Sequence, residues 1–127
     1  MDNEISKLRC RDAFLTLAGE DFKRLVDFYC KLLRRNPQPY RPEVYAEFQL
    51  PGMRLGIFKP NIDHAAEFAS PSSGGLSLCL EVEDLEGAIA HLTNLGYPPP
   101  DAIVAASHGQ EVYAYDPAGN RIILHQS

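Results

Sequence analysis

Carboxylate and imidazole side chains in the second half of the chain could bind a metal ion. The candidates are Glu81, His108, Glu111 and His125, since divalent metals take imidazole nitrogen or carboxylate oxygen as ligands. No two of them show a local ligand spacing such as His-x-x-x-His. A displaced metal site is one hypothesis. The favoured interpretation is that they are ordinary half-exposed strand and loop residues.

Two further arrangements could supply a nucleophile. Ser107 and His108 are adjacent, but neighbours in an extended segment point to opposite sides, and the Gly-x-Ser-x-Gly turn of hydrolases does not accompany them. Cys79 would be a reactive thiol if Arg54 or Arg121 lowered its pKa, and is otherwise a small buried apolar side chain. The buried interpretation of Cys79 is favoured.

These side chains would be positioned by an order of elements that occurs twice along the chain. Residues 14–21 are typical of an alternating strand that leads to a helix cap, Asp21, and an amphipathic helix follows. Residues 76–82 repeat the strand, Asp84 repeats the cap, and Gly96 ends the second helix. Each half therefore predicts β, α, and then two or three further β-strands.

The later strands follow a proline-rich break in each half. In the first half they form a hairpin, residues 45–50 and 53–58, around a Pro51-Gly52 turn. In the second half the expected strands and turn are residues 103–105, 111–115, the turn 116–119, and 121–125. The two halves thus predict the same αβ module.

The length of 127 residues and an apolar content of 45% suit one domain with a buried core. We expect a single domain over residues 1–127, with module one at about 10–60 and module two at about 76–126. The segment between them, about 61–75, is rich in small polar residues and predicts a surface linker.

Alternation along the strands separates a helix-facing side from a free face where a ligand would lie. Leu76, Leu78, Leu80 and Val82 are expected on the helix side of their strand. The ligand-binding candidates on the free faces are Phe14, Thr16, Arg54, Phe58, Ser77, Cys79, Glu81, Glu111, Tyr113, Arg121, Ile123 and His125. A further polar row consists of Tyr45, Glu47 and Gln49.

The sequence resembles the vicinal oxygen chelate superfamily, the group of glyoxalases, bleomycin resistance proteins and extradiol dioxygenases. The residues that carry the resemblance are Phe14-Leu-Thr-Leu to Asp21, Phe28-Tyr29, Leu80-Glu-Val-Glu-Asp84 with Leu95-Gly96, and Asp116-Pro-Ala-Gly-Asn120. The resemblance implies an α+β fold in which two tandem βαβββ modules form curled sheets around a shared cleft, with helices on the outer face. It also implies a homodimer.

Enzymes of this superfamily place four metal ligands in that cleft. The resemblance puts Phe14, Gly56, Ser77 and Ile123 at the corresponding positions. Three of these carry no ligand atom, and a serine hydroxyl is a poor donor, so neither a metal nor another cofactor is expected. Phe14 and Ile123 could plug the cleft, whereas Gly56 would leave it open.

The leading hypothesis is therefore a metal-free small-molecule binding protein that resembles bleomycin resistance proteins and sequesters an unidentified ligand. Phe14, Phe58, Tyr113 and Ile123 would form the wall of the cleft. One alternative is a glyoxalase-like or dioxygenase-like enzyme, a lyase or isomerase, that uses displaced metal ligands or a metal-free general base drawn from Glu81, Glu111 or His125. Another is an interaction module whose cleft is plugged.

Charge and cysteine content exclude other classes of function. The net charge of −5 disfavours nucleic acid as a partner, because phosphate binding needs an excess of clustered cations. The run Lys31, Arg34 and Arg35 is interpreted as the solvated end of a helix. The three cysteines lack paired spacings and predict reduced thiols in a cytoplasmic protein, and no segment predicts membrane insertion.

Overall fold

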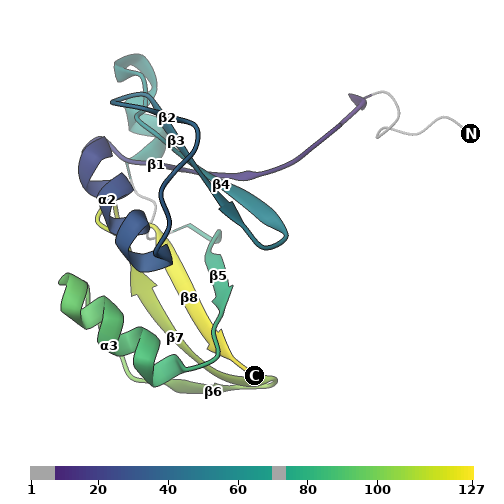
Figure 1. The fold of residues 1–127 in the computed structure, drawn as a ribbon, viewed down its shortest axis with the longest axis vertical. Coiled ribbons are helices and arrows are strands. Elements are labelled where there is room, and N and C mark those ends of the chain that lie inside the picture. The colour runs from purple at the N-terminus through teal and green to yellow at the C-terminus, as the bar shows by residue number, and fades with distance from the viewer. Residues whose placement is uncertain (1–7, 70–73) are drawn as a thin grey trace, which may run out of the picture.

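Two four-stranded sheets form the framework of the computed structural model, which describes residues 8–69 and 74–127 (Figure 1). Sheet A has the strand order β1 (Leu15–Ala18), β4 (Met53–Phe58), β3 (Tyr45–Leu50), β2 (Tyr40–Arg41). Sheet B has the order β5 (Leu78–Glu81), β8 (Arg121–Gln126), β7 (Gly109–Tyr115), β6 (Val104–Ala106). β1 pairs in parallel with β4, β5 pairs in parallel with β8, and the other pairs are antiparallel. The α+β fold of two tandem βαβββ modules is confirmed.

The helices begin at the expected caps. Asp21 Oδ1 accepts a hydrogen bond of 3.3 Å from the Arg24 amide at the start of α2 (Phe22–Leu33). Asp84 Oδ1 accepts one of 3.1 Å from the Gly87 amide at the start of α3 (Leu85–Leu95), which ends at Gly96 with a φ of 94°. Such caps satisfy amides that have no partner inside the helix. Both helices lie on the same side of the molecule, to the left of the sheets in Figure 1.

Two local expectations are corrected by the structure. Strand β5 begins at Leu78, the first residue that pairs with β8, so Leu76 precedes the strand and is 66% exposed instead of packing on the helix side. The segment expected to be a linker contains a 3-10 helix, η1 (Ile62–Phe68), where Asn61 Oδ1 accepts a hydrogen bond of 2.9 Å from the Asp63 amide. Residues 1–7 and 70–73, the latter part of that segment, lie outside the described residues.

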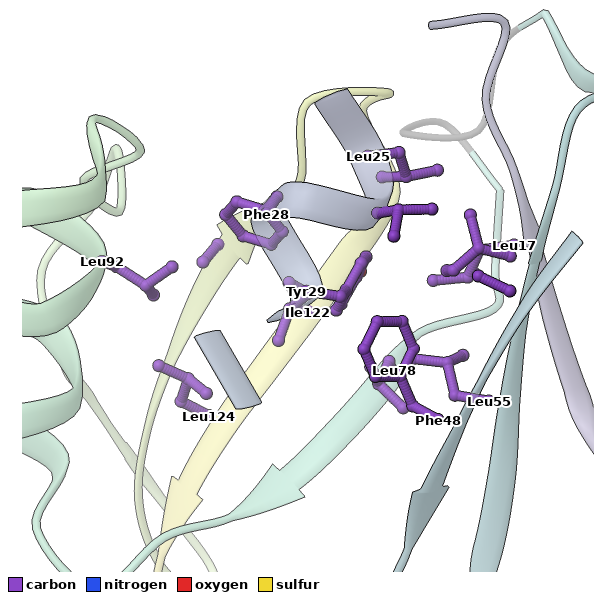
Figure 2. Close-up of a cluster of buried hydrophobic side chains, with 14 of the residues drawn as sticks. Leu17, Leu25, Phe28, Tyr29, Phe48, Leu55, Leu78, Leu92, Ile122 and Leu124 are labelled. Carbon is purple, nitrogen blue, oxygen red and sulfur yellow. The ribbon is translucent and has the colours of Figure 1, made fainter. Parts of the chain in front are cut away.

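The hydrophobic core is a single cluster to which both modules contribute (Figure 2). Side chains of α2 pack there with residues of both sheets, among them Leu17, Phe48, Leu55, Leu78, Ile122 and Leu124. At its edge the Tyr29 hydroxyl donates a buried hydrogen bond of 2.8 Å to Asp116 Oδ2, in the turn between β7 and β8. Burial raises the pKa values of both groups. A helix of module one is thereby fixed to a turn of module two.

None of the described helices has the length and apolar content that crossing a membrane requires.

Candidate functional site

The free face of sheet A is occupied by a paired polar network. Glu47, which is 7% exposed, accepts hydrogen bonds from Tyr45 Oη at 2.7 Å and from Gln49 Nε2 at 3.0 Å. Arg54 Nη1 donates to Glu47 Oε1 at 3.0 Å, and Nη2 contacts the carboxylate of Asp12. The side chains that sequence alternation placed in a polar row therefore bind one another.

Gly56 is covered by the phenol ring of Tyr45. A Cβ atom at Gly56 would lie 2.6 Å from Tyr45 Oη, which is closer than real Cβ contacts allow. The strand register explains this arrangement, because Gly56 pairs with Glu47 and Tyr45 lies two residues along the same face. The expectation that Gly56 opens the site is wrong, since the missing side chain makes room for a ring of the protein itself.

Hydrogen bonding sets the protonation states of this network. Donation from Tyr45 and Gln49, with Arg54 adding a positive charge, lowers the pKa of Glu47 below its ordinary value. Burial, and then the hydrogen bond to Glu47, raise the pKa of Tyr45 to about 12. At neutral pH the face therefore carries an ionised carboxylate and a neutral phenol, and each stabilises the state of the other.

The free face of sheet B carries a carboxylate and imidazole pair. His125 Nδ1 lies 2.6 Å from Glu81 Oε1, and Glu81 Oε2 accepts hydrogen bonds from the Ser127 hydroxyl at 2.6 Å and the Ser127 amide at 3.0 Å. These bonds lower the pKa of Glu81, the Ser127 hydroxyl having the largest effect. Glu111 pairs with His125 in the strand register from the opposite side. An ionised Glu81 fixes one nitrogen of the ring, which is how histidine bases are oriented.

Cys79 is on the same face and is exposed, so the favoured interpretation of a buried side chain is wrong, but it is not an activated thiol. Its pKa is raised, first by burial and then by the negative charges of Glu111 and Glu81. The hypothesis that Arg54 or Arg121 lowers the pKa of Cys79 is therefore wrong, because two carboxylates dominate the charge around it. A thiol in such surroundings reacts slowly.

A cavity of about 300 Å³ lies where β1 meets the start of β5. Thr16, Ser77 and Arg121, three of the expected ligand-binding residues, line it together. Arg121 Nη1 donates to Ser77 Oγ at 3.0 Å and Nη2 to the Gly74 carbonyl at 2.8 Å. Apolar side chains complete the wall, chiefly those of Leu17, Phe68, Leu76 and Leu78. This cavity joins residues of both modules.

The residues at the metal positions of the resembled enzymes do not fit a metal ion. The guanidinium carbon of Arg54 lies 4.4 Å from the centre of the Phe14 ring, and Arg121 binds Ser77. A cationic group thus stands at two of the four positions and would repel a divalent cation. Within residues 8–69 and 74–127 no group of three or more His, Cys, Asp and Glu side chains could hold a metal. We assign no chemical step to a metal.

The other expected site residues are divided between the two sheets. Phe14 lies against Arg54, whereas Phe58 contacts Phe68 edge to face with a centroid separation of 5.2 Å. On sheet B, Tyr113 and Ile123 form one cross-strand row with Cys79. The proposed wall of Phe14, Phe58, Tyr113 and Ile123 is therefore divided, with two phenylalanine rings beside sheet A and one tyrosine ring and one isoleucine on sheet B. Its role in binding stays a prediction.

The sequence did not predict the hydrogen bond between Arg54 and Glu47 or two apolar residues that line the cavity. Glu47 and Tyr45 were placed on the free face by alternation, but the hydrogen bond from Arg54 to Glu47 arises only through the β3–β4 register. Phe68 and Leu76 line the cavity from η1 and from the segment before β5. The signal for them was the presence of large apolar residues in a segment otherwise rich in small polar ones.

Solved structures share this arrangement over nearly the whole chain. A glyoxalase/bleomycin resistance protein from Catenulispora acidiphila is 25% identical, with a TM-score of 0.67 over 91% of this chain and 97% of that one. The chain has the fold of the vicinal oxygen chelate superfamily. No protein-family model matches its sequence, and no curated protein is significantly similar to it.

Other neighbours with the vicinal oxygen chelate fold have different activities. Lactoylglutathione lyase from Agrobacterium tumefaciens is 16% identical, with a TM-score of 0.68 over 91% of this chain and 93% of that one. A bleomycin-binding protein in complex with bleomycin is 20% identical, with a TM-score of 0.64 over 93% of this chain and 99% of that one. An enzyme and a binding protein thus share the fold, so the fold alone does not select the function.

Proposed function

We propose that this protein binds a small organic molecule without a metal ion and sequesters it unchanged in the cavity between β1 and β5. The observation that carries the proposal is the composition of that cavity. Phe68 and Leu76 line it while remaining 40% and 66% exposed, beside the polar groups of Thr16, Ser77 and Arg121. An apolar wall with a few convergent polar groups is the usual form of a ligand pocket.

The volume and position of the cavity support the same function. About 300 Å³ is within the range of small-molecule sites, at its lower end. Because β1 and β5 belong to different modules, the pocket forms only when the chain is fully folded. The likeness to a bleomycin-binding protein is in keeping with ligand binding in this fold.

A thermal-shift screen of small organic molecules, with metal content measured on the same preparation, tests the proposal. Thr16→Trp would fill the cavity, and Thr93→Trp, at an exposed position of α3, is the matched control. We expect compounds that stabilise the wild type to lose at least about tenfold in affinity in Thr16→Trp and to keep it in Thr93→Trp. Stoichiometric metal that is required for binding would contradict the proposal.

The pair of Glu81 and His125 favours a second candidate, a metal-free general-base enzyme. An imidazole held at Nδ1 by a carboxylate can accept a proton at Nε2. Compounds from the screen would be incubated with the protein and recovered for mass spectrometry, with His125→Gln as the matched variant. Conversion by the wild type alone would favour this candidate, and recovery of unchanged compound would favour sequestration.

The oligomeric state belongs to the same proposal. We expect a homodimer with the ligand as its small-molecule partner and no nucleic acid bound, and analytical ultracentrifugation tests the association.

A further inference from the structure

A second cavity, of about 490 Å³, lies where the end of α2, the β3–β4 turn, β5 and α3 meet. Its wall is aliphatic and comes from both modules: Leu32, Leu33, Leu50, Met53, Leu80 and Val82. All six pack against the core and yet are only partly buried. Partly buried aliphatic side chains that converge from four elements indicate a surface suited to an apolar ligand.

The guanidinium of Arg35 stands at the rim of this cavity. Arg35 lines it, and its Nη1 donates to the Gln49 carbonyl at 2.8 Å, which holds the guanidinium above the aliphatic wall. His91 also lines it, with Nε2 2.8 Å from the Lys31 carbonyl. Lys31 and Arg34 are exposed on the same last turn and cap of α2. This is a local cluster of positive charge on a chain whose net charge is −5.

The acidic residue at the rim does not cancel this cluster. Glu81 lines the cavity, but its carboxylate accepts hydrogen bonds from His125 and Ser127 on the free face of sheet B. Compensation of the helix dipole explains why cations occur at the end of α2. It does not explain why one of them, Arg35, borders an aliphatic cavity.

We propose that this second cavity binds the alkyl chain of a medium-chain fatty acid, with the carboxylate at the guanidinium of Arg35. The aliphatic wall excludes water around the chain, and arginine forms paired hydrogen bonds with carboxylates. The site is separate from the cavity between β1 and β5, so it does not depend on the proposed function.

Calorimetric titration with sodium decanoate, octanoate and hexanoate, all below their micelle concentrations, tests the chain pocket. Burial of each added methylene should raise the affinity about fourfold. Decan-1-ol has the same chain without the charge and should bind at least about tenfold more weakly than decanoate. Saturable decanoate binding that strengthens with chain length supports the proposal. Its absence, or equal affinity for decanoate and decan-1-ol, overturns it.

Variants locate the site. Ala88→Phe places a ring in the cavity, and Arg35→Gln removes the charge; Arg41→Gln, on exposed β2, is the matched control. We expect both cavity variants to weaken decanoate binding at least about tenfold and Arg41→Gln to leave it unchanged. Thr16→Trp should also leave it unchanged. Loss of decanoate binding in Thr16→Trp, or full binding in Arg35→Gln, would overturn the assignment of decanoate to the second cavity. The Arg35→Gln measurement still decides if Ala88→Phe fails to fold.

Discussion

The free faces of the two sheets follow the same plan and differ in what their side chains contact. Arg54 in β4 and Arg121 in β8 occupy matching places, each two residues before a position that corresponds to a metal ligand. Arg54 binds Glu47 and Asp12, whereas Arg121 binds Ser77 and the Gly74 carbonyl beside a cavity. Similar sequence positions therefore serve a closed polar network in one module and the rim of a pocket in the other.

The residues opposite the metal positions show the same contrast. Glu47 pairs with Gly56 and is 7% exposed, while Tyr113 pairs with Ile123 and is 42% exposed. A buried, fully paired carboxylate stabilises the sheet that holds it, and an exposed ring remains available for contact with a ligand. Sheet A therefore contributes mainly stability, and sheet B offers more groups for binding.

The largest expected effect comes from removing the centre of the sheet A network. Glu47→Ala removes the carboxylate acceptor that Tyr45, Gln49 and Arg54 share, and should lower the free energy of unfolding by about 2–4 kcal/mol. Tyr113→Ala, the matching position of sheet B, should lower it by less than about 1 kcal/mol. Urea unfolding measures both. Equal losses of unfolding free energy in the two variants would show that the sheet A face does not contribute more stability than the sheet B face.

Substitution at Gly56 tests whether Tyr45 closes the sheet A face. Gly56→Ala forces the Tyr45 ring to move and should cost about 1–3 kcal/mol of stability. Gly75→Ala is the matched control, because no atom of the described residues other than its chain neighbours lies within 4 Å of its Cβ position. It should change stability by less than about 0.5 kcal/mol. Thermal unfolding compares them. An unchanged melting temperature in Gly56→Ala would mean that the ring is not held there.

A fall in pH should reduce the stabilising contribution of the sheet A face more than that of the sheet B face. The pKa of Glu47 is lower in the folded chain than in the unfolded chain, so its contribution is present above the ordinary glutamate pKa of about 4.3 and is lost as the pH falls. Unfolding free energies measured from pH 6 to pH 2.5 should fall less steeply in Glu47→Gln than in the wild type. Glu81→Gln should show a smaller difference, because Glu81 is exposed, although its pKa is also lowered. If Glu81→Gln reduced the pH dependence of the unfolding free energy more than Glu47→Gln did, the sheet B carboxylate would be the more stabilising of the two.

The smallest expected effect concerns the thiol of sheet B. Glu111→Gln removes a charge that raises the pKa of Cys79 and should increase its alkylation rate by iodoacetamide at pH 7.5 about twofold. Glu86→Gln, on exposed helix α3, should leave the rate unchanged. Peptide mass spectrometry follows Cys79 separately from the other cysteines. A slower reaction in Glu111→Gln would contradict the electrostatic explanation.

Much of the fold follows from local signals in the sequence. Asp21 and Asp84 cap the two helices, and Pro51-Gly52 turns the hairpin, because these residues act on their immediate neighbours. Strand alternation placed Leu55, Ile57, Ile122 and Leu124 in the core for the same reason. The start of β5 was misplaced, since the alternation of Leu76 with Leu78 gives no indication of where pairing with β8 begins.

The candidate site was less predictable because it depends on contacts between distant residues. Arg54 reaches both Asp12 and Glu47, and Tyr45 covers Gly56, only after β3 and β4 have paired. The pKa of Cys79 is likewise raised by partial burial, and then by the carboxylates of Glu111 and Glu81, once β7 and β5 lie on either side of β8. Residue types indicated which chemistry was possible, and the register decided which groups meet.

The hydrogen bond between Tyr29 and Asp116 joins the two modules of the internal repeat through a buried polar contact, so the modules are linked by more than the chain between them. Either half expressed alone would expose the apolar side of α2 or the strands that it covers, and would leave one of these two polar groups without its partner. The two modules share one hydrophobic core, so neither is expected to fold as an independent unit. A change that tilts α2 relative to one sheet therefore also alters its packing on the other sheet, and it reshapes the second cavity, whose wall includes Leu32 and Leu33 of α2.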